Sequence, residues 1–157
     1  MTLNVAIVLA TRLLLCALFL PFSALDKLLN FAGAVGQARQ AVGTRVVAVG
    51  LILAGLCVEV FMSLGVISGI ADRACAFVLA GYCGVTALGW KQFWKPGDFW
   101  SAKDGQARGL FWDFLKNFAL AGGFLLITFG TRVDSVGEFL SHPLSSSHPY
   151  QLRPASP

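Results

Sequence analysis

The feature that most constrains this chain is a set of four apolar stretches, each close to the length of a helix that crosses a bilayer. They cover residues 3–22, 46–70, 74–90 and 114–130. An α-helix of about 20 apolar residues spans the hydrocarbon core, and it satisfies its own backbone amides and carbonyls. The stretches predict an all-α fold, an integral membrane four-helix bundle over residues 1–130.

Composition supports the same class. Charged residues make up only 13% of the 157 residues and hydrophobic residues 56%, whereas soluble domains carry about 25% charged residues. No run of Lys and Arg interleaved with aromatic residues predicts nucleic-acid binding. The first stretch has no basic segment before it. The one plausible signal-peptide cleavage point follows Ala24, and the bulky Phe22 would occupy its −3 position. We therefore expect this stretch to be retained as a span.

The loops predict an orientation. Seven basic residues lie between the first and second spans or between the third and fourth, and three lie on the other side. The two groups are Lys27, Arg39, Arg45, Lys91, Lys95, Lys103 and Arg108, against Arg73, Arg132 and Arg153. The positive-inside rule places both long loops in the cytoplasm and both termini outside, with a bacterial inner membrane as the expected location.

All four tryptophans lie in or beside the loop between the third and fourth spans. They are Trp90, Trp94, Trp100 and Trp112. Tryptophan is enriched at membrane–water interfaces, where its amphipathic ring lies at the level of the lipid headgroups. We predict that these four residues anchor the loop to the membrane.

The first loop predicts a short interfacial helix between spans one and two. In LDKLLNFAGAVGQARQAVG (25–43), apolar residues from Leu25 to Val35 recur at three- and four-residue spacing. Gly33 and Gly36 weaken this pattern, and an irregular connector remains the alternative. After residue 130 the composition changes to Ser, Pro, His and Gly, which predicts a disordered polar tail over 131–157.

That tail holds both histidines, His142 and His148, so the predicted bundle has no histidine to bind a haem or a metal, and we predict no metal site. The cysteines Cys16, Cys57, Cys75 and Cys83 all lie in apolar stretches without a C-x-x-C pair. Cys75 and Cys83 would stand about 12 Å apart on one helix, too far for a disulfide. We interpret the cysteines as small core residues, and bridges between different helices remain open.

Glu59 is the most unusual residue of the spans. A charged side chain at bilayer depth is costly unless it is paired, which makes it a candidate functional residue. Arg12 lies about nine residues, roughly 14 Å, from the start of the first span, and Glu59 lies at a similar depth in the second. We predict an Arg12–Glu59 pair as the catalytic pair, on a helix face that Gly55 and Ser63 share with Glu59. Simple helix-to-helix adhesion is the alternative.

A second polar group is predicted near the cytoplasmic ends of the spans. Asp26 and Lys27 end the first span, and Asp113, Lys116 and Asn117 begin the fourth. Tyr82 and Thr86 of the third span lie between the two groups. We predict that a substrate contacts this set, namely Asp26, Lys27, Lys116, Asn117, Tyr82 and Thr86. Lysines at helix ends also extend toward the interface without any such role.

Three segments resemble the DoxX family. RLLLCALFLPFSALDKLLNFAGAVG (12–36) resembles its opening, VEVFMSLGV (58–66) its glutamate-containing second span, and FLKNFALAGGFLLI (114–127) its Leu-Lys-Asn and Gly-Gly stretch. The resemblance covers about residues 11–130. It implies a four-helix membrane bundle in which Arg12, Asp26, Lys27, Glu59, Lys116 and Asn117 occupy family positions. Many relatives have a histidine near the end of the third span, where this chain has Trp90, Lys91 and Gln92.

The resemblance also implies functions. Family members are associated with thiosulfate:quinone oxidoreduction and with membrane complexes that handle thiols, so we expect a redox-associated membrane subunit that uses a quinone or thiosulfate. No residue pattern in the chain binds a cofactor recognisably. Two alternatives remain: a non-catalytic scaffold subunit with protein partners in the membrane, and a small-solute carrier or cargo receptor that uses the same charged interior.

Overall fold

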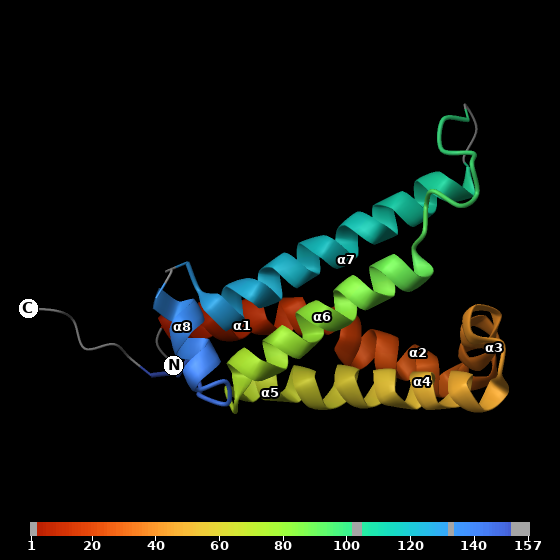
Figure 1. The fold of residues 1–157 in the computed structure, drawn as a ribbon. Helices are drawn as coiled ribbons and strands as arrows, with labels where there is room; N and C mark the ends of the chain where they lie inside the picture. Colours follow the sequence, from red (N-terminus) through yellow and green to blue (C-terminus); the bar gives the residue numbers. More distant parts are fainter. Residues whose placement is uncertain (1–2, 102–104, 132–133, 152–157) are drawn as a thin grey trace, which may run out of the picture.

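The computed structural model describes residues 3–101, 105–131 and 134–151. All the regular structure in these residues is helical. Four helical segments are long and apolar enough to cross a membrane: Leu3–Leu29, Arg45–Ser68, Asp72–Trp90 and Gln106–Phe129. The predicted all-α membrane bundle is confirmed. The four segments run back and forth between the two ends of the bundle, and α6 and α7 are inclined to the first two spans (Figure 1).

The first span is a broken helix. It consists of α1 (Leu3–Ala17), the π-helical turn η1 (Leu18–Ser23) and α2 (Ala24–Leu29). The backbone of Leu20 is non-helical, with φ −124° and ψ 110°, directly before Pro21. Proline lacks an amide hydrogen and disfavours the helical conformation in the residue before it. The break precedes the turn that carries Ser23 and Lys27.

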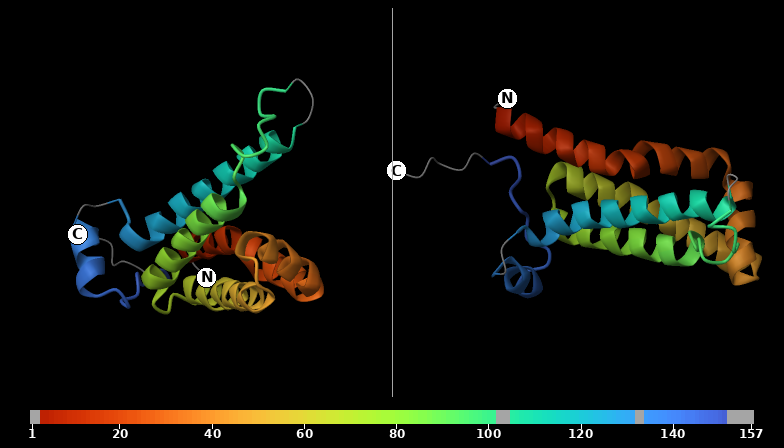
Figure 2. Two further views of the ribbon diagram at one scale, coloured as in Figure 1. Left: turned by 45° about the vertical axis from the view of Figure 1, so that its right-hand side comes forward. Right: turned by 90° about the horizontal axis from the view of Figure 1, so that it is seen from above.

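The interfacial helix is also present. Helix α3 (Phe31–Val42) follows Asn30 and ends at Gly43, which has a φ of +76°. Its buried residues Val35 and Ala38 pack against Ala48 at the start of the second span. Helix α3 lies across one end of the bundle (Figures 1 and 2), and we call this end the loop end.

The second span contains a π-helical turn at its predicted site residue. It is formed by α4 (Arg45–Cys57), η2 (Val58–Met62) and α5 (Ser63–Ser68), and Glu59 lies within η2. Gly69 ends α5 in the left-handed region, with φ +80°, as glycine commonly does after a helix. The third span is α6 (Asp72–Trp90), which packs most extensively on α7 (Gln106–Phe129).

Helix α7 begins at Gln106 rather than at the predicted residue 114, because the preceding loop caps it. The two carboxylate oxygens of Asp98 accept hydrogen bonds from the amides of Gln106 and Ala107, at 2.8 and 3.0 Å. Phe93 packs edge-on against Phe111 and Phe114 of α7, and Phe99 also contacts Phe93 and Phe111. We call these four rings the aromatic cluster. It folds the loop back onto α7.

The bundle core lies between α1, α5, α6 and α7. Its fully buried side chains include Cys16, Val66, Leu79, Cys83 and Phe124. Cys16 and Cys83 are core residues, as predicted, whereas Cys57 is exposed and Cys75 is only partly buried. All four thiols are free.

The chain after the fourth span differs from the predicted disordered tail. Helix α8 (Asp134–Ser141) buries Phe139 against Phe77 and Phe129. Beyond α8, the C-terminal segment (residues 145–150) hydrogen-bonds to the α5–α6 turn. One aromatic ring and several hydroxyls thus provide contacts that a count of apolar residues misses. Residues 132–133 and 152–157 of the predicted tail lie outside the described residues. Helix α8 marks the other end of the bundle, which we call the α8 end (Figure 2).

Two buried charge clusters

The Glu59 cluster joins three spans around one carboxylate oxygen. Glu59 is 1% exposed. Its Oε1 accepts hydrogen bonds from the Ser23 hydroxyl and the Tyr82 hydroxyl, both at 2.9 Å, and forms an ion pair with the Lys27 ammonium. The Lys27 Nζ also lies 2.8 Å from the Ser23 hydroxyl. A lysine from the first span therefore neutralises the buried acid of the second.

Local structure places these groups. Ser23 and Lys27 lie one helical turn apart, after the break at Pro21, so both reach the same neighbour. Glu59 lies in a π-helical turn, a distortion that is frequent at functional sites. Gly55, Glu59 and Ser63 are all buried, which confirms the predicted inward face. A Cβ at Gly55 would lie 3.1 Å from the Tyr82 hydroxyl, so a larger residue there would crowd the hydroxyl.

The second carboxylate oxygen of Glu59 is different. Its Oε2 is buried and has no hydrogen-bond partner among the described residues, and neither has the Ser63 hydroxyl one turn along the same helix. Buried polar atoms are almost always hydrogen-bonded, and an unpaired one is costly. Three donors of the cluster thus contact Oε1, and no donor from a described residue contacts Oε2.

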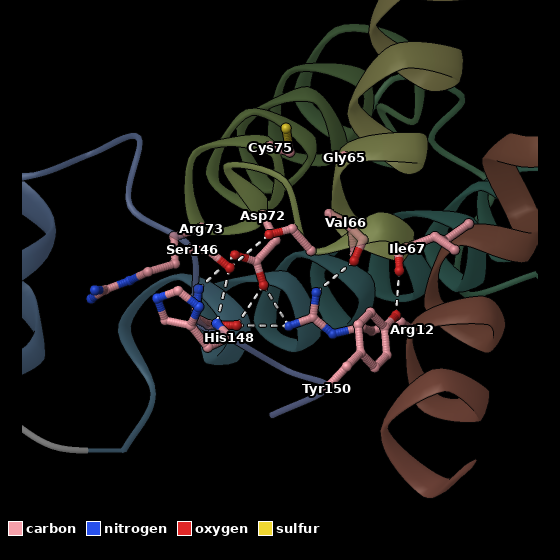
Figure 3. Close-up of polar contacts among 12 residues, drawn as sticks. Arg12, Gly65, Val66, Ile67, Asp72, Arg73, Cys75, Ser146, His148 and Tyr150 are labelled. Carbon is pink, nitrogen blue, oxygen red and sulfur yellow. Dashed lines mark hydrogen bonds and ion pairs between the residues drawn. The ribbon is translucent and has the colours of Figure 1, made fainter. Parts of the chain in front are cut away.

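The Arg12 cluster lies at the α8 end. The Arg12 guanidinium donates to the Val66 carbonyl at 2.5 Å and forms an ion pair with Asp72 at 2.6 Å. Asp72 is fully buried, and it also accepts bonds from the amide and hydroxyl of Ser147. Figure 3 shows this set beneath the α5–α6 turn, where the Tyr150 hydroxyl donates to the Ile67 carbonyl.

The predicted Arg12–Glu59 pair is wrong. Arg12 pairs with Asp72, and Glu59 pairs with Lys27. The prediction measured depth from the outer end of each span, which is the start of the first span and the end of the second, but the start of α1 extends beyond the end of α5 (Figure 2). Arg12 is therefore level with Val66, and the end of the same span is level with Glu59. The two charged groups of the prediction belong to separate clusters.

The second predicted group does not assemble either. Lys27 and Tyr82 join Glu59, and Thr86 lies half-buried one turn beyond Tyr82. Asp26 instead accepts a bond from Asn30 at 2.7 Å, and it is exposed. Near the start of α7, Asp113 pairs with Lys91 at 3.0 Å and with Lys116 at 3.4 Å, and its carbonyl accepts a bond from Asn117. No hydrogen bond or ion pair between described residues links these α7 residues to Asp26 or Lys27.

Sequence reasoning missed two participants. Asp72 lies just before the predicted third span, 74–90, and was therefore not considered, although an acid at a helix start is itself a recognised signal. Ser147 gave no such signal, because it lies in a serine-rich stretch. The four tryptophans are all exposed at the loop end: Trp90 by 39%, Trp94 by 51%, Trp100 by 91% and Trp112 by 56%.

Comparison with known proteins gives one match. The DoxX family model matches residues 7–92, more than half of the chain, from α1 through α6. The match includes the ion pairs of the two buried clusters, Arg12–Asp72 and Lys27–Glu59. It ends before residues 114–127, so it does not test their resemblance to the family. No curated protein matches the chain, and no solved structure matches it. The chain belongs to the DoxX family.

Proposed function

We propose that this DoxX-family membrane protein is a redox-associated subunit that acts on a quinone or a sulfur compound, with Glu59 as the residue that exchanges a proton with it. One observation carries the proposal: in the part of the chain that the structure describes, Glu59 Oε2 is buried without a hydrogen-bond donor, while Oε1 accepts bonds from three donors. A hydroquinone hydroxyl or a thiol supplies the donor that Oε2 lacks. Carboxylates are established general bases and proton relays in membrane proteins.

The neighbours of Glu59 suit this role. Lys27 balances the charge of the carboxylate, and Tyr82 and Ser23 hold Oε1 in place, so that Oε2 keeps one orientation. The Ser63 hydroxyl offers a second polar atom to a bound molecule. In this proposal Glu59 replaces the Arg12–Glu59 pair as the site, and Arg12 has no part in it.

The test is a pull-down of tagged protein in a mild detergent, with mass spectrometry of the extracted quinones and bound proteins. We expect a quinone to copurify with the wild type and to be lost in Glu59→Gln. The double variant Lys27→Met/Glu59→Leu should also lose it while remaining folded, because replacing both members of a buried ion pair is often near-neutral. Arg39→Met, which removes an exposed cation of α3, should keep it.

Melting curves of each variant separate a lost site from a lost fold. A folded Glu59→Gln protein that retains the quinone would overturn the proposed role of Glu59. If wild-type protein carries no quinone, the same preparation is titrated with thiosulfate and with a small thiol. No binding of any of the three would overturn the redox assignment.

A scaffold role is the second candidate, and one observation favours it. Trp100 is 91% exposed, although the neighbouring Phe99 ring packs against Phe111 of the aromatic cluster. An exposed indole beside a packed ring is suited to anchor a protein interface. A partner that copurifies with wild type and Glu59→Gln but not with Trp100→Ser would support this role.

We also propose that the tryptophans anchor the loop end at the cytoplasmic headgroups, with both termini outside.

A further inference from the structure

A cavity of about 640 Å³ opens at the α8 end, between α1, α7, α8 and the C-terminal segment. One of its sides is apolar and includes Ile7 and Leu126, which are 55% and 60% exposed on the membrane-spanning surface. The other side is polar and includes Arg12, Arg73, Glu138, Ser147 and His148. A molecule that fills this cavity must therefore be amphipathic.

The two arginines of the cavity differ in how their charge is balanced. Arg12 is neutralised by Asp72, which is fully buried and is not part of the cavity wall. Arg73 extends away from that contact toward α8 (Figure 3). Its Nη1 forms an ion pair with Glu138, 3.4 Å away on a side chain that is 66% exposed. The Arg73 side chain is 8% exposed, but solvent screens the exposed carboxylate of Glu138, so another anion can replace this carboxylate.

The remaining contacts of Arg73 hold its guanidinium at the cavity wall. Its Nε donates to the Thr128 carbonyl at 2.9 Å, and its Nη2 donates to the Ser135 carbonyl at 2.8 Å. The guanidinium also lies 5.8 Å from the centre of the Phe139 ring. These bonds leave Nη1 directed at the exposed Glu138, so a preoriented cation faces the position that an incoming anion would take.

The cavity lies where the membrane-spanning helices end. The start of the third span and the end of the fourth line it, and α8 beside it exposes the apolar side chains Val136 and Leu140 by 42% and 73%. Exposed apolar residues on a helix at the end of a membrane bundle indicate an interfacial position. Basic pockets between membrane helices bind anionic lipid headgroups.

We propose that this cavity binds one anionic phospholipid, with the phosphate on Arg73 and an acyl chain along Ile7 and Leu126. A free phosphate ion has the charge that Arg73 attracts, but it leaves the apolar side uncovered, which favours the lipid. The C-terminal segment forms part of the headgroup wall through Ser147 and His148. This binding site is separate from Glu59 and does not depend on the proposed redox function.

The experiment is native mass spectrometry of the detergent-solubilised protein, titrated with phosphatidylglycerol, with phosphatidylcholine and with inorganic phosphate. We expect phosphatidylglycerol to bind in a 1:1 ratio and more tightly than phosphatidylcholine. Arg73→Gln should weaken phosphatidylglycerol binding about tenfold, as expected for loss of a charge-assisted hydrogen bond. Glu138→Gln should strengthen this binding, because the competing carboxylate is gone. Arg39→Gln removes an equal charge at the opposite end of the bundle and should leave the affinity unchanged.

Leu126→Ser tests the apolar side. We expect it to weaken phosphatidylglycerol binding without changing any binding of inorganic phosphate. If inorganic phosphate competes with the lipid at equal concentration, the cavity is a free-anion site and the lipid proposal is wrong. Equal binding of the two lipids, or equal effects of Arg73→Gln and Arg39→Gln in folded protein, would also overturn it.

Discussion

Lys27 and Glu59 act as one unit, because each is costly to bury without the other. The Lys27 side chain is 18% exposed and that of Glu59 is 2% exposed. Removing one partner of a buried ion pair typically costs about 3–5 kcal/mol, whereas replacing both partners is often neutral. The isolated acid in an apolar stretch was sufficient to predict that Glu59 is buried and paired. The identity of its partner depends on how far one helix is shifted along another, which a depth count within each helix does not determine.

The first prediction concerns the stability of this pair. Lys27→Met should lower the free energy of unfolding by about 3 kcal/mol, because it strands a buried carboxylate. The double variant Lys27→Met/Glu59→Leu should recover most of this loss. Thermal unfolding in detergent micelles, followed by circular dichroism, measures both. Equal melting temperatures for the single and double variants would mean that Glu59 does not depend on Lys27.

A second prediction at this scale concerns Gly65, where α5 approaches α6 closely. A Cβ at Gly65 would lie 2.3 Å from the Cys75 Sγ and 3.2 Å from its Cβ. Gly65→Ala should therefore destabilise the bundle by about 1–3 kcal/mol, the usual cost of overpacking. Adding Cys75→Ala should restore part of the loss, because it removes the closer atom.

Gly81→Ala in α6 is the matched control, because no neighbouring atom lies within 4 Å of the added Cβ. It should be neutral or slightly stabilising, since alanine favours a helix by about 1 kcal/mol over glycine. The same melting experiment measures all three variants. Similar losses for Gly65→Ala and Gly81→Ala would show that close packing at Cys75 is not the cause.

At the scale of the elements, apolar length predicted that the four spans exist, but not where each begins and ends. The segment QARGLFWD (106–113) contains two charged residues and reads as loop, yet it is the first part of α7. Contacts from residues before the helix stabilise it there, through Asp98 and the aromatic cluster. The break at Pro21 and the fold of α8 likewise depend on neighbours that are distant in sequence.

The third prediction tests the cap. Asp98→Ala removes both acceptors from the amides of Gln106 and Ala107, so it should cost about 1 kcal/mol and fray the first turn of α7. Asp98→Asn keeps one carbonyl acceptor, so it should lower the free energy of unfolding by less than Asp98→Ala does. Hydrogen exchange followed by mass spectrometry should show faster exchange at residues 106–110 and no change in α4. Unchanged exchange in the alanine variant would show that the aromatic cluster alone holds this turn.

For the whole molecule, the two charge clusters connect different sets of segments. The Glu59 cluster ties the first, second and third spans together within the bundle, whereas the Arg12 cluster ties these three spans to the C-terminal segment. The hydroxyl of Ser146 also bonds to the Gly69 carbonyl, at 2.7 Å. The α8 end is thus closed by a segment that carries almost no apolar signal, which explains why its sequence predicted disorder.

The fourth prediction is that this closure protects the α5–α6 turn. A chain that ends at His142 keeps the four spans and α8 but loses the residues that contact Asp72, Gly69 and Ile67. Amides of residues 66–75 should exchange faster in this chain, and those of residues 79–87 should not. Tyr150→Phe removes only one of the contacts and should show a smaller effect in the same direction. Identical exchange in the full and shortened chains would contradict it.

The position of the tryptophans makes the protein its own optical probe. Because Trp90, Trp94, Trp100 and Trp112 all lie at the loop end and are all exposed, the ultraviolet emission of the chain reports on that end alone. Iodide, which does not cross a lipid bilayer, would quench this light in sealed right-side-out vesicles only if the loop end faces outward. If iodide quenches the tryptophan emission only after the vesicles are opened, the loop end lies in the cytoplasm, as the basic residues predict.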